Sequence, residues 1–165
     1  MNIKFIGSYF FGGYEVIMIR KLTINDFEIV ESIVAKLHKI HVNNRPDFYI
    51  ENEHPIKKKE YKAMLNSKDK INIAYLVDDK IVGVCLATIK DKIEKSIYID
   101  DICVLEEFRH QGIATKLYKQ VESIAKDIGA KRIDLTVWQF NKSAMKFYES
   151  LGMKTQRKIL ETRLK

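Results

Sequence analysis

Apolar residues recur at helical spacing early in the chain. Between residues 25 and 40 they fall three and four positions apart, which places them on one face of a helix. This face consists of Ile29, Ile33, Val34, Leu37 and Ile40. Asn25 or Asp26 can cap the start of the helix, and Pro46 breaks the helix after its end. A second, shorter helix is predicted over residues 57–66.

The middle of the chain has the composition of β-strands. β-branched and aromatic residues predict strands over residues 71–77, 81–90 and 98–104. The polar residues Asp78, Asp79 and Lys80 predict a tight turn, which makes the first two strands a hairpin. Together these segments predict an antiparallel meander.

A helix and a strand follow the meander. Apolar positions at helical spacing predict a helix from residue 113 to near Gly129, which is a suitable residue to end it. Residues 131–137 are predicted as the next strand. A right-handed crossover through the helix sets this strand parallel to strand 98–104.

The last part of the chain completes the predicted fold. A helix over residues 141–150 stops at Gly152, and residues 153–164 offer one or two closing strands. We therefore expect an α/β (α+β) fold with a single mixed, mostly antiparallel central sheet of six to seven strands and helices on both faces.

The N-terminal residues do not fit this pattern clearly. Met18 begins a segment typical of the first strand of a small α/β domain, so residues 18–165 are predicted to form the domain. Residues 1–17 are either an extension that is dispensable for activity or an added edge strand. A signal peptide is not expected, because glycines interrupt the apolar stretch and no small-residue cleavage site follows it.

Composition narrows the classes of function only slightly. The chain has 165 residues, of which 46% are hydrophobic and 31% charged, and a net charge of +7. Its basic residues are spread out, so nucleic acid is not the expected partner, and no apolar run of about 20 residues predicts a membrane span. Cys85 and Cys103 lack the spacing of a metal or redox motif, which predicts reduced thiols in a cytoplasmic protein.

The sequence between residues 98 and 115 contains the clearest candidate for a binding site. A strand leads through a polar turn into Arg109-His110-Gln111-Gly112-Ile113-Ala114, where the next helix begins. Small residues at Gly112 and Ala114 let backbone N–H groups approach a phosphate, and the helix dipole favours the negative charge. Neither a Walker loop nor a Rossmann fingerprint is present. Taken alone, this hexamer is equally compatible with an ordinary helix N-terminus beside an unrelated arginine.

Arg-x-x-Gly-x-Ala after a strand resembles the coenzyme A loop of the GNAT superfamily of acetyl-CoA-dependent N-acetyltransferases. The resemblance implies acetyl-CoA as cosubstrate and no metal. His110 and Gln111 replace the Gly and the Lys or Arg that are frequent in this family, at positions that vary within it. The residues implied to bind the cofactor in this region are Ile102, Cys103, Val104, Arg109, His110, Gln111, Gly112, Ile113, Ala114 and Thr115.

Residues 135–153 resemble the second signature of the same family, a strand followed by Asn-x-x-Ala-x-x-Phe-Tyr-x-x-x-Gly-Phe/Met. The resemblance implies that Asn141 and Ser143 contact the cofactor and that Tyr148 points at its sulfur. Without it, Asn141 is explained as a helix N-cap, and Tyr148 as a core aromatic residue whose hydroxyl finds a partner.

The implied reaction is attack of a neutral amine on the thioester. For a lysine-like amine, deprotonation at pH 7 costs roughly 4–5 kcal/mol, so a base is needed. By analogy with polyamine acetyltransferases, Asp100 is the expected base and Asp101 a charge that attracts the amine. Adjacent strand residues point to opposite faces unless a bulge intervenes, and either carboxylate could simply pair with a lysine.

Two further roles follow from the resemblance. A backbone N–H near Cys103 or Val104 is expected to stabilise the thioester oxygen, and Tyr148 to protonate the leaving thiolate. A covalent acetyl-cysteine route through Cys103 is not expected, because no histidine or cationic residue adjoins it in the sequence.

The acceptor site is expected at the end of the first helix, where the resemblance places Arg45, Asp47, Phe48 and Tyr49. His38 and His41 share a helix face there, but no third metal ligand has a convincing spacing. The expected acceptor is a small polyamine-like or amino-acid-like amine. A protein N-terminus, a lysine or an aminoacyl-tRNA is the alternative acceptor, and a non-catalytic acyl-CoA-binding module the alternative class. Dimers are common in the family, and the sequence leaves the oligomeric state open.

Overall fold

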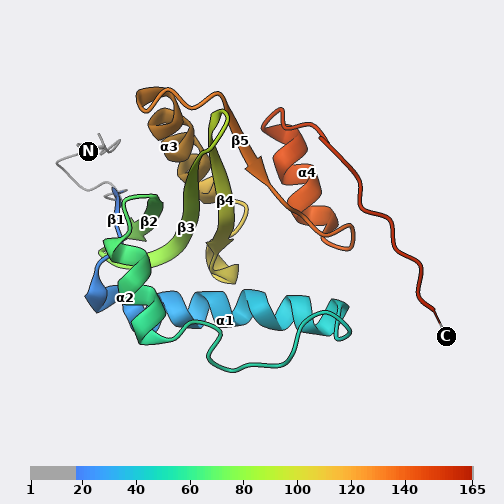
Figure 1. The fold of residues 1–165 in the computed structure, drawn as a ribbon. Coiled ribbons are helices and arrows are strands. Elements are labelled where there is room, and N and C mark those ends of the chain that lie inside the picture. Colours follow the sequence, from blue (N-terminus) through green and yellow to red (C-terminus); the bar gives the residue numbers. More distant parts are fainter. Residues whose placement is uncertain (1–17, 165) are drawn as a thin grey trace.

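The computed structural model describes residues 18–164, which form a five-stranded sheet with four α-helices (Figure 1). The strands stand side by side in their order along the chain. The strands are β1 (Met18–Lys21), β2 (Lys70–Val77), β3 (Lys80–Asp91), β4 (Lys95–Val104) and β5 (Arg132–Leu135). The helices are α1 (Phe27–Asn44), α2 (Lys58–Asn66), α3 (Ile113–Asp127) and α4 (Lys142–Ser150), with 3₁₀ turns at Ile24–Asp26 and Glu106–Phe108.

The predicted topology of the sheet is confirmed. The first four strands pair antiparallel, and β5 pairs parallel with β4 after the crossover through α3. Asp78 and Asp79 both have positive φ angles, so the two-residue turn between β2 and β3 has the backbone twist that a tight hairpin requires. The mixed α/β class therefore agrees with the prediction.

Helices cover both faces of the sheet. One face packs against α1 and α2 through a buried cluster that includes Val30, Ile33 and Tyr61. The other face packs against α3, whose Leu117 and Val121 are fully buried. The two clusters together form the core around the three long strands β2, β3 and β4, so the middle of the sheet is held on both sides.

Gly83 on β3 lets α3 approach the sheet closely. A Cβ atom at this position would lie 3.2 Å from the carbonyl oxygen of Cys103, 3.2 Å from Cγ2 of Ile113 and 3.3 Å from Cδ1 of Leu117. These distances are tighter than ordinary van der Waals contacts. The absence of a side chain at Gly83 thus sets how near the first turn of α3 stands to the end of β4.

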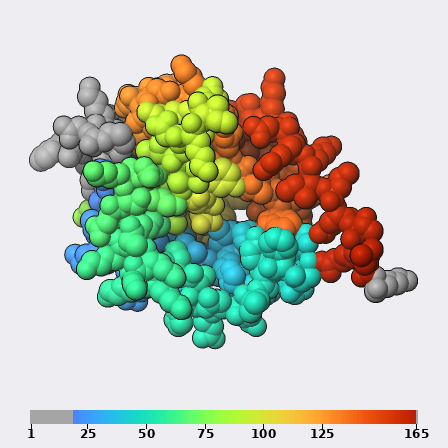
Figure 2. Space-filling view, viewed as in Figure 1, coloured from blue at the N-terminus to red at the C-terminus, as the bar shows by residue number. Residues whose placement is uncertain are grey.

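The sheet has five strands in the described residues, not the six to seven predicted. The difference lies at residues 153–164, which follow α4 without forming a strand. Their strand-like composition is not sufficient, because a strand needs a partner for its backbone groups and this segment runs along the outside of the molecule (Figures 1 and 2). The proposed extension or edge strand at residues 1–17 lies outside the described residues.

The first helix also differs in detail from the prediction. It continues past Ile40 to Asn44 and ends just before Arg45, the residue that precedes Pro46. Asp26 stands at the N-cap position, but its side chain makes no cap hydrogen bond to α1. Its carboxylate instead accepts hydrogen bonds from Arg20 and Thr23. The Arg20 guanidinium therefore holds the pKa of Asp26 down at about 2, although burial opposes that shift.

Candidate active site

The start of α3 presents open backbone N–H groups. Gly112 occupies the N-cap position with φ 75°, and no side chain caps the helix. Beyond the adjoining backbone, no heavy atom lies within 4 Å of the place where its Cβ would be. Ile113 is buried and anchors this first turn in the core, so its contribution to a ligand is its backbone amide. The arrangement offers the positive end of the helix dipole and uncapped backbone N–H donors to an anion such as a phosphate.

The residues before Gly112 surround this helix end with polar groups. Arg109 donates a hydrogen bond from Nε to the carbonyl oxygen of Val104 at 3.2 Å, which ties its side chain to the end of β4. His110 and Gln111 are exposed, and His110 adopts a positive φ of 62°. Gln111 donates to the carbonyl of Glu107 at 3.4 Å. Ala114 and Thr115 follow, half-buried in the first turn of α3.

Strands β4 and β5 part beside this helix end. The parallel pairing begins at Ser96 with Arg132 and ends at Ile99 with Leu135, although β4 continues to Val104. Within the described chain, no strand pairs with the outer edge of β4 over residues 100–104. Ile102, Cys103 and Val104 therefore offer backbone groups along an open edge that leads toward α3.

A β-bulge places both candidate carboxylates on one face of the sheet. Leu86 pairs with Asp101 and Ala87 pairs with Ile99, which leaves Asp100 as the extra residue of β4. The Thr88 hydroxyl bonds Asp100, and Thr88 lies two residues along β3 from Leu86, on the same face. Leu86 packs in the cluster under α1 and α2. Asp100 and Asp101 therefore both lie on the face that α1 and α2 cover.

The surroundings of the two carboxylates differ. Oδ2 of Asp100 is 2.9 Å from the Lys70 ammonium and accepts a hydrogen bond of 2.5 Å from Thr88. Asp101 is more deeply buried, and this burial, reinforced by the charge of Asp100, raises its pKa to about 6 against the opposing effect of Lys70. Asp100 is thus an ion-paired carboxylate, whereas Asp101 holds a pKa suited to accepting a proton near neutral pH.

Tyr148 lies on α4, close enough to Asp101 for the two groups to interact electrostatically. Burial raises the pKa of its phenol, and the neighbouring Cys85, Cys103 and Asp101 raise it further. Its ring contacts Phe147 with centroids 5.1 Å apart. The phenol therefore stays protonated at neutral pH, in the form that can donate a proton.

The start of α4 is fixed by Asn141. Its Oδ1 accepts a hydrogen bond of 3.1 Å from the backbone N–H of Ala144, as the N-cap interpretation predicts. This cap sets the direction of the helix that carries Tyr148. Ser143 is exposed in the first turn. The contacts of Asn141 and Ser143 with a cofactor remain predictions.

The two cysteines are free, as expected. Cys85 is buried, and Cys103 lies on β4 beside Asp101. Burial and the nearby Asp101 raise the pKa of Cys103 to about 12, although Arg109 opposes them. A thiol held in the protonated form is a poor nucleophile, which does not favour a covalent acetyl-cysteine route.

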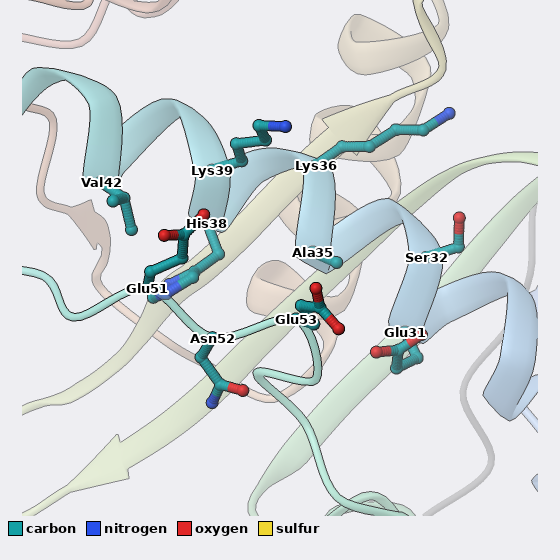
Figure 3. Close-up of a pocket in the computed structure, with 10 residues that line it drawn as sticks. All are labelled: Glu31, Ser32, Ala35, Lys36, His38, Lys39, Val42, Glu51, Asn52 and Glu53. Atoms are coloured by element: carbon teal, nitrogen blue, oxygen red, sulfur yellow. The ribbon is translucent and has the colours of Figure 1, made fainter.

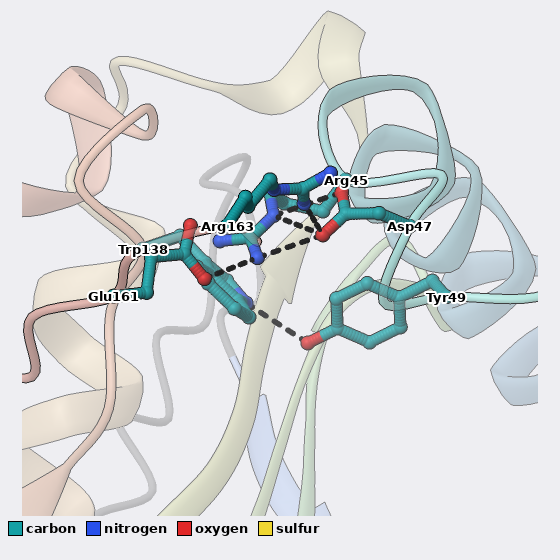
Figure 4. A network of polar contacts seen from close by, with 6 residues as sticks. All are labelled: Arg45, Asp47, Tyr49, Trp138, Glu161 and Arg163. Carbon is teal, nitrogen blue, oxygen red and sulfur yellow. Dashed lines mark hydrogen bonds and ion pairs between the residues drawn. The ribbon is translucent and has the colours of Figure 1, made fainter. Parts of the chain in front are cut away.

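Aromatic side chains from two distant parts of the chain meet at the end of α1 (Figure 4). Nε1 of Trp138, which follows β5, donates a hydrogen bond of 2.9 Å to the hydroxyl of Tyr49. Trp138 also packs edge-on against Phe48 and stacks on Phe140. His41 stacks on Tyr49 at 5.0 Å, and burial lowers its pKa. The contacts join the segment after α1 to the loop before α4.

A charged network covers this aromatic group (Figure 4). The Arg45 guanidinium lies 4.6 Å from the Trp138 ring centroid and pairs with Asp47 at 2.9 Å and Glu161 at 3.0 Å. Arg163 also pairs with Asp47. Sequence reasoning named Arg45 and Asp47 but did not select Trp138 or the two C-terminal residues, since only the folded chain brings them together.

A hollow beside α1 lies away from the candidate catalytic groups (Figure 3). It is bounded by α1 and residues 51–53. His38 bonds the carbonyl of Ile50 at 2.9 Å, and His54 bonds Glu31 at 2.9 Å, which holds this segment against the helix. Across residues 18–164, no group of three or more His, Cys, Asp or Glu side chains is arranged to hold a metal ion. None of the described helices is long and apolar enough to span a membrane.

Comparison with known sequences agrees with this geometry. A profile of the acetyltransferase (GNAT) family matches residues 35–153. Thialysine N-epsilon-acetyltransferase of Bos taurus is 43% identical over 58 residues, which cover 35% of this chain and 34% of that protein. N-alpha-acetyltransferase 30 of Schizosaccharomyces pombe is 31% identical over 100 residues, which cover 59% of this chain and 67% of that protein. The chain spans about a third of the length of the thialysine relatives it matches.

Solved structures share the fold over nearly the whole chain. The BH1408 protein of Bacillus halodurans, solved as a tetramutant, superposes with a TM-score of 0.86 at 27% identity and covers 89% of this chain and 99% of that one. An aminoglycoside N-acetyltransferase in complex with CoA has a TM-score of 0.73 at 17% identity, covering 94% and 99% of the two chains, which shows the shared fold alone. Because the family profile covers more than half of the 165 residues, this protein belongs to the acetyltransferase (GNAT) family.

Proposed function

We propose that this protein transfers the acetyl group of acetyl-CoA to a primary amine of a small molecule that resembles a polyamine or an amino acid. The observation that carries the proposal is the uncapped start of α3 beside the open edge of β4, with Tyr148 close enough to Asp101 for that carboxylate to raise the pKa of its phenol. The free cysteines fit a cytoplasmic enzyme, because thiols stay reduced there.

The chain offers suitable groups for acetyl-CoA. The backbone N–H groups at the start of α3, with Arg109, His110 and Gln111 beside them, suit the pyrophosphate. The open edge of β4 suits the amide groups of the pantetheine arm, and Asn141 and Ser143 stand at the adjoining helix start. Acetyl-CoA, when bound, supplies the acetyl group as an activated thioester. A backbone N–H near Cys103 or Val104 remains the proposed donor to its oxygen.

We assign the base to Asp101 and the attraction of the amine to the carboxylate pair as a whole. Asp100 is already engaged by the Lys70 ammonium and the Thr88 hydroxyl. Asp101, with its pKa of about 6, is ionised at pH 7–8 and still basic enough to accept a proton from an ammonium group, directly or through water. Our proposal thus moves the base from Asp100, which the analogy with the polyamine acetyltransferases favours, to Asp101.

Tyr148 is the proposed general acid. Its raised pKa keeps a proton on the phenol oxygen until the leaving sulfur requires one. Its position on α4 is fixed by the Asn141 cap at one end of the helix. Its environment therefore has the features that a proton donor needs: partial burial, and a neighbouring charge that opposes ionisation.

The acceptor is proposed to enter beside the aromatic group around Tyr49 and Trp138. Ring faces attract a cationic amine, and Asp101 supplies a negative charge further in. Arg45, Asp47 and Phe48 border this entrance. The thialysine relatives favour a lysine-like small amine, whereas the N-alpha relatives favour a protein N-terminus as the second candidate acceptor.

A turnover assay with an amine panel tests the proposal. Release of free thiol from acetyl-CoA is followed with spermidine, thialysine, an N-terminal peptide and an aminoacyl-tRNA as separate acceptors. Thiol release with the small amines supports the proposal. Release only with the peptide or the tRNA would show that this larger molecule is the acceptor and would contradict a small-molecule acceptor. Binding of acetyl-CoA by calorimetry without any turnover contradicts an enzymatic function.

Tyr148→Phe tests the general acid with Tyr118→Phe as matched control. Tyr118 is a buried tyrosine of α3 and packs in the core rather than at the site. We expect Tyr148→Phe to lower kcat on the order of 100-fold with little change in the affinity for acetyl-CoA, because only proton donation is removed. A kcat equal to that of the control would take the general-acid role away from Tyr148.

A further inference from the structure

Two arginines stand at the outer end of the acceptor region. The Arg45 guanidinium lies 4.6 Å from the centroid of the Trp138 ring and 5.6 Å from that of Phe48, so two aromatic rings orient its plane. Arg163 joins Arg45 through Asp47, with which both arginines pair. An oriented, planar guanidinium is the group that proteins use to recognise a carboxylate with a defined geometry.

The hydrogen-bond donors of Arg45 are only partly used. Asp47 accepts hydrogen bonds from Nε at 3.1 Å and from Nη2 at 2.9 Å. Oε2 of Glu161 accepts from Nη2 alone, at 3.0 Å, and no group in residues 18–164 accepts from Nη1. A guanidinium can bind one further carboxylate through Nη1 and Nη2 together. This edge of Arg45 is therefore only half used by Glu161.

Glu161 is held weakly in this position. Its side chain is 59% exposed, and it belongs to residues 154–164, which are all exposed. Figure 4 shows it reaching Arg45 from the last part of the chain. An ion pair that is open to water and has a single hydrogen bond stabilises little, so a ligand carboxylate that bonds both Nη1 and Nη2 can displace it. Glu161 thus stands where the carboxylate of an acceptor can bind.

The inner end of the site suits a single ammonium group. Asp100 is engaged by the Lys70 ammonium at 2.9 Å and by the Thr88 hydroxyl at 2.5 Å. Asp101 forms no ion pair with any side chain of residues 18–164, so its charge is the one left for an acceptor amine. A polyamine brings a second ammonium group, which would have to compete with Lys70 for Asp100. A charge of opposite sign at the far end of the acceptor fits this site better.

The two ends of the site are separated along α1. Val34 packs in the same buried cluster as Leu86, the residue that pairs with Asp101. Because a helix rises about 1.5 Å per residue, Arg45 lies roughly 16 Å further along the axis of α1 than Val34. The side chains of Arg45 and Asp101 shorten this interval from both ends. The carboxylate and the reacting amine of one acceptor must therefore stand at opposite ends of an extended side chain.

We propose that the acceptor is an amino acid whose side chain ends in a primary amine, and that Arg45 binds its carboxylate in the place that Glu161 holds while Asp101 receives the amine. This inference rests on the acetyl transfer proposed above and narrows its acceptor to an amino acid rather than a polyamine. Arg45 determines specificity and takes no part in the transfer itself. Loss of the acceptor carboxylate therefore raises KM and leaves kcat nearly unchanged.

Three acceptors with the same carbon chain test the proposal. Lysine, lysinamide and cadaverine each end in a primary amine, but the amide lacks the negative charge and cadaverine lacks the carboxyl group. The product acetylated at the side-chain amine is separated by chromatography. We expect kcat/KM for lysine to exceed that for the other two by roughly 10- to 100-fold. Equal values for all three would overturn the inference and leave acetyl transfer to amines intact, whereas no turnover with any amine would refute both.

Arg45→Gln tests the assigned residue, with Arg132→Gln as matched control. Arg132 also pairs with two carboxylates, Asp134 and Glu94, but it begins β5 at the end away from the site. We expect Arg45→Gln to raise KM for lysine roughly 10- to 100-fold and the control to leave it unchanged. Glu161→Gln is expected to lower this KM, because it removes the competing carboxylate.

Lysinamide distinguishes lost recognition from a damaged fold. Its KM and kcat should be the same in Arg45→Gln and in the wild type, because the amide has no carboxylate for the guanidinium to bind. A KM for lysine that Arg45→Gln leaves unchanged would overturn the assignment of the carboxylate to Arg45. A KM that rises equally for lysine and lysinamide would overturn it too, since the arginine would then support the site without recognising the carboxylate.

Discussion

Asp101→Asn tests the raised pKa of the proposed base through its effect on the free energy of unfolding. The half-buried carboxyl of Asp101 has its pKa raised from 3.8 to about 6. At about 1.4 kcal/mol per pH unit, this difference corresponds to about 3 kcal/mol as an upper value. Because the folded protein binds this proton more tightly than the unfolded chain does, the stabilisation is present below pH 4 and is lost as the pH rises through about 6.

The asparagine variant lacks this titration. Roughly 2 kcal/mol of the change is expected between pH 4.5 and pH 8, so the free energy of unfolding of the variant should rise by that amount relative to wild type over this interval. Urea unfolding at a series of pH values measures the difference directly. Turnover of the variant at pH 7.5 should fall on the order of 100-fold, because the base is lost.

Asp91→Asn is the matched control for this experiment. Asp91 is an exposed carboxylate at the end of β3, 3.5 Å from Lys95, so its loss should change stability little and by the same amount at each pH. A stability difference between Asp101→Asn and wild type that stays constant from pH 4.5 to pH 8 would refute the argument. It would show that burial does not raise the pKa of Asp101, and the assignment of the base would fall with it.

Substitutions at three positions test the framework of the site. Gly83→Ala should lower the free energy of unfolding by about 1–3 kcal/mol in urea unfolding, because the added methyl meets Cys103, Ile113 and Leu117 at 3.2–3.3 Å; an unchanged midpoint would contradict this close approach. Gly112→Ala has open space but a φ of 75°, so calorimetry should show weaker binding of coenzyme A together with a loss of about 1 kcal/mol in stability. Asn141→Ala should cost about 1 kcal/mol through loss of the cap, and Asn141→Ser should restore most of it; equal stability of the two variants would argue against capping.

Local sequence signals were sufficient for several parts of the protein. The turn at Asp78 and Asp79, the cap at Asn141 and the start of α3 at Gly112 were all predicted, because each depends on residues within a few positions of one another. The order of the strands and the parallel pairing of β5 also followed, since chain connectivity and handedness limit the alternatives. Phe48 and Tyr49 of the acceptor region were selected only through the family resemblance.

Other features depend on contacts between segments far apart in the chain. The bulge at Asp100 exists because β3 and β4 change register beside Leu86, and strand composition contains no signal for that shift. The closing strands over residues 153–164 were wrongly predicted, because strand-like composition does not provide a partner for the backbone.

The sequence by itself determined the local elements of this protein, their order, and the polar groups at the start of α3, since each of these depends on neighbouring residues. Only the tertiary structure decided that Asp100 pairs with Lys70, that Asp101 is half-buried near Tyr148, and that Trp138 meets Tyr49. The physical reason is that burial, ion pairing and pKa arise from which groups the fold brings together across long stretches of chain.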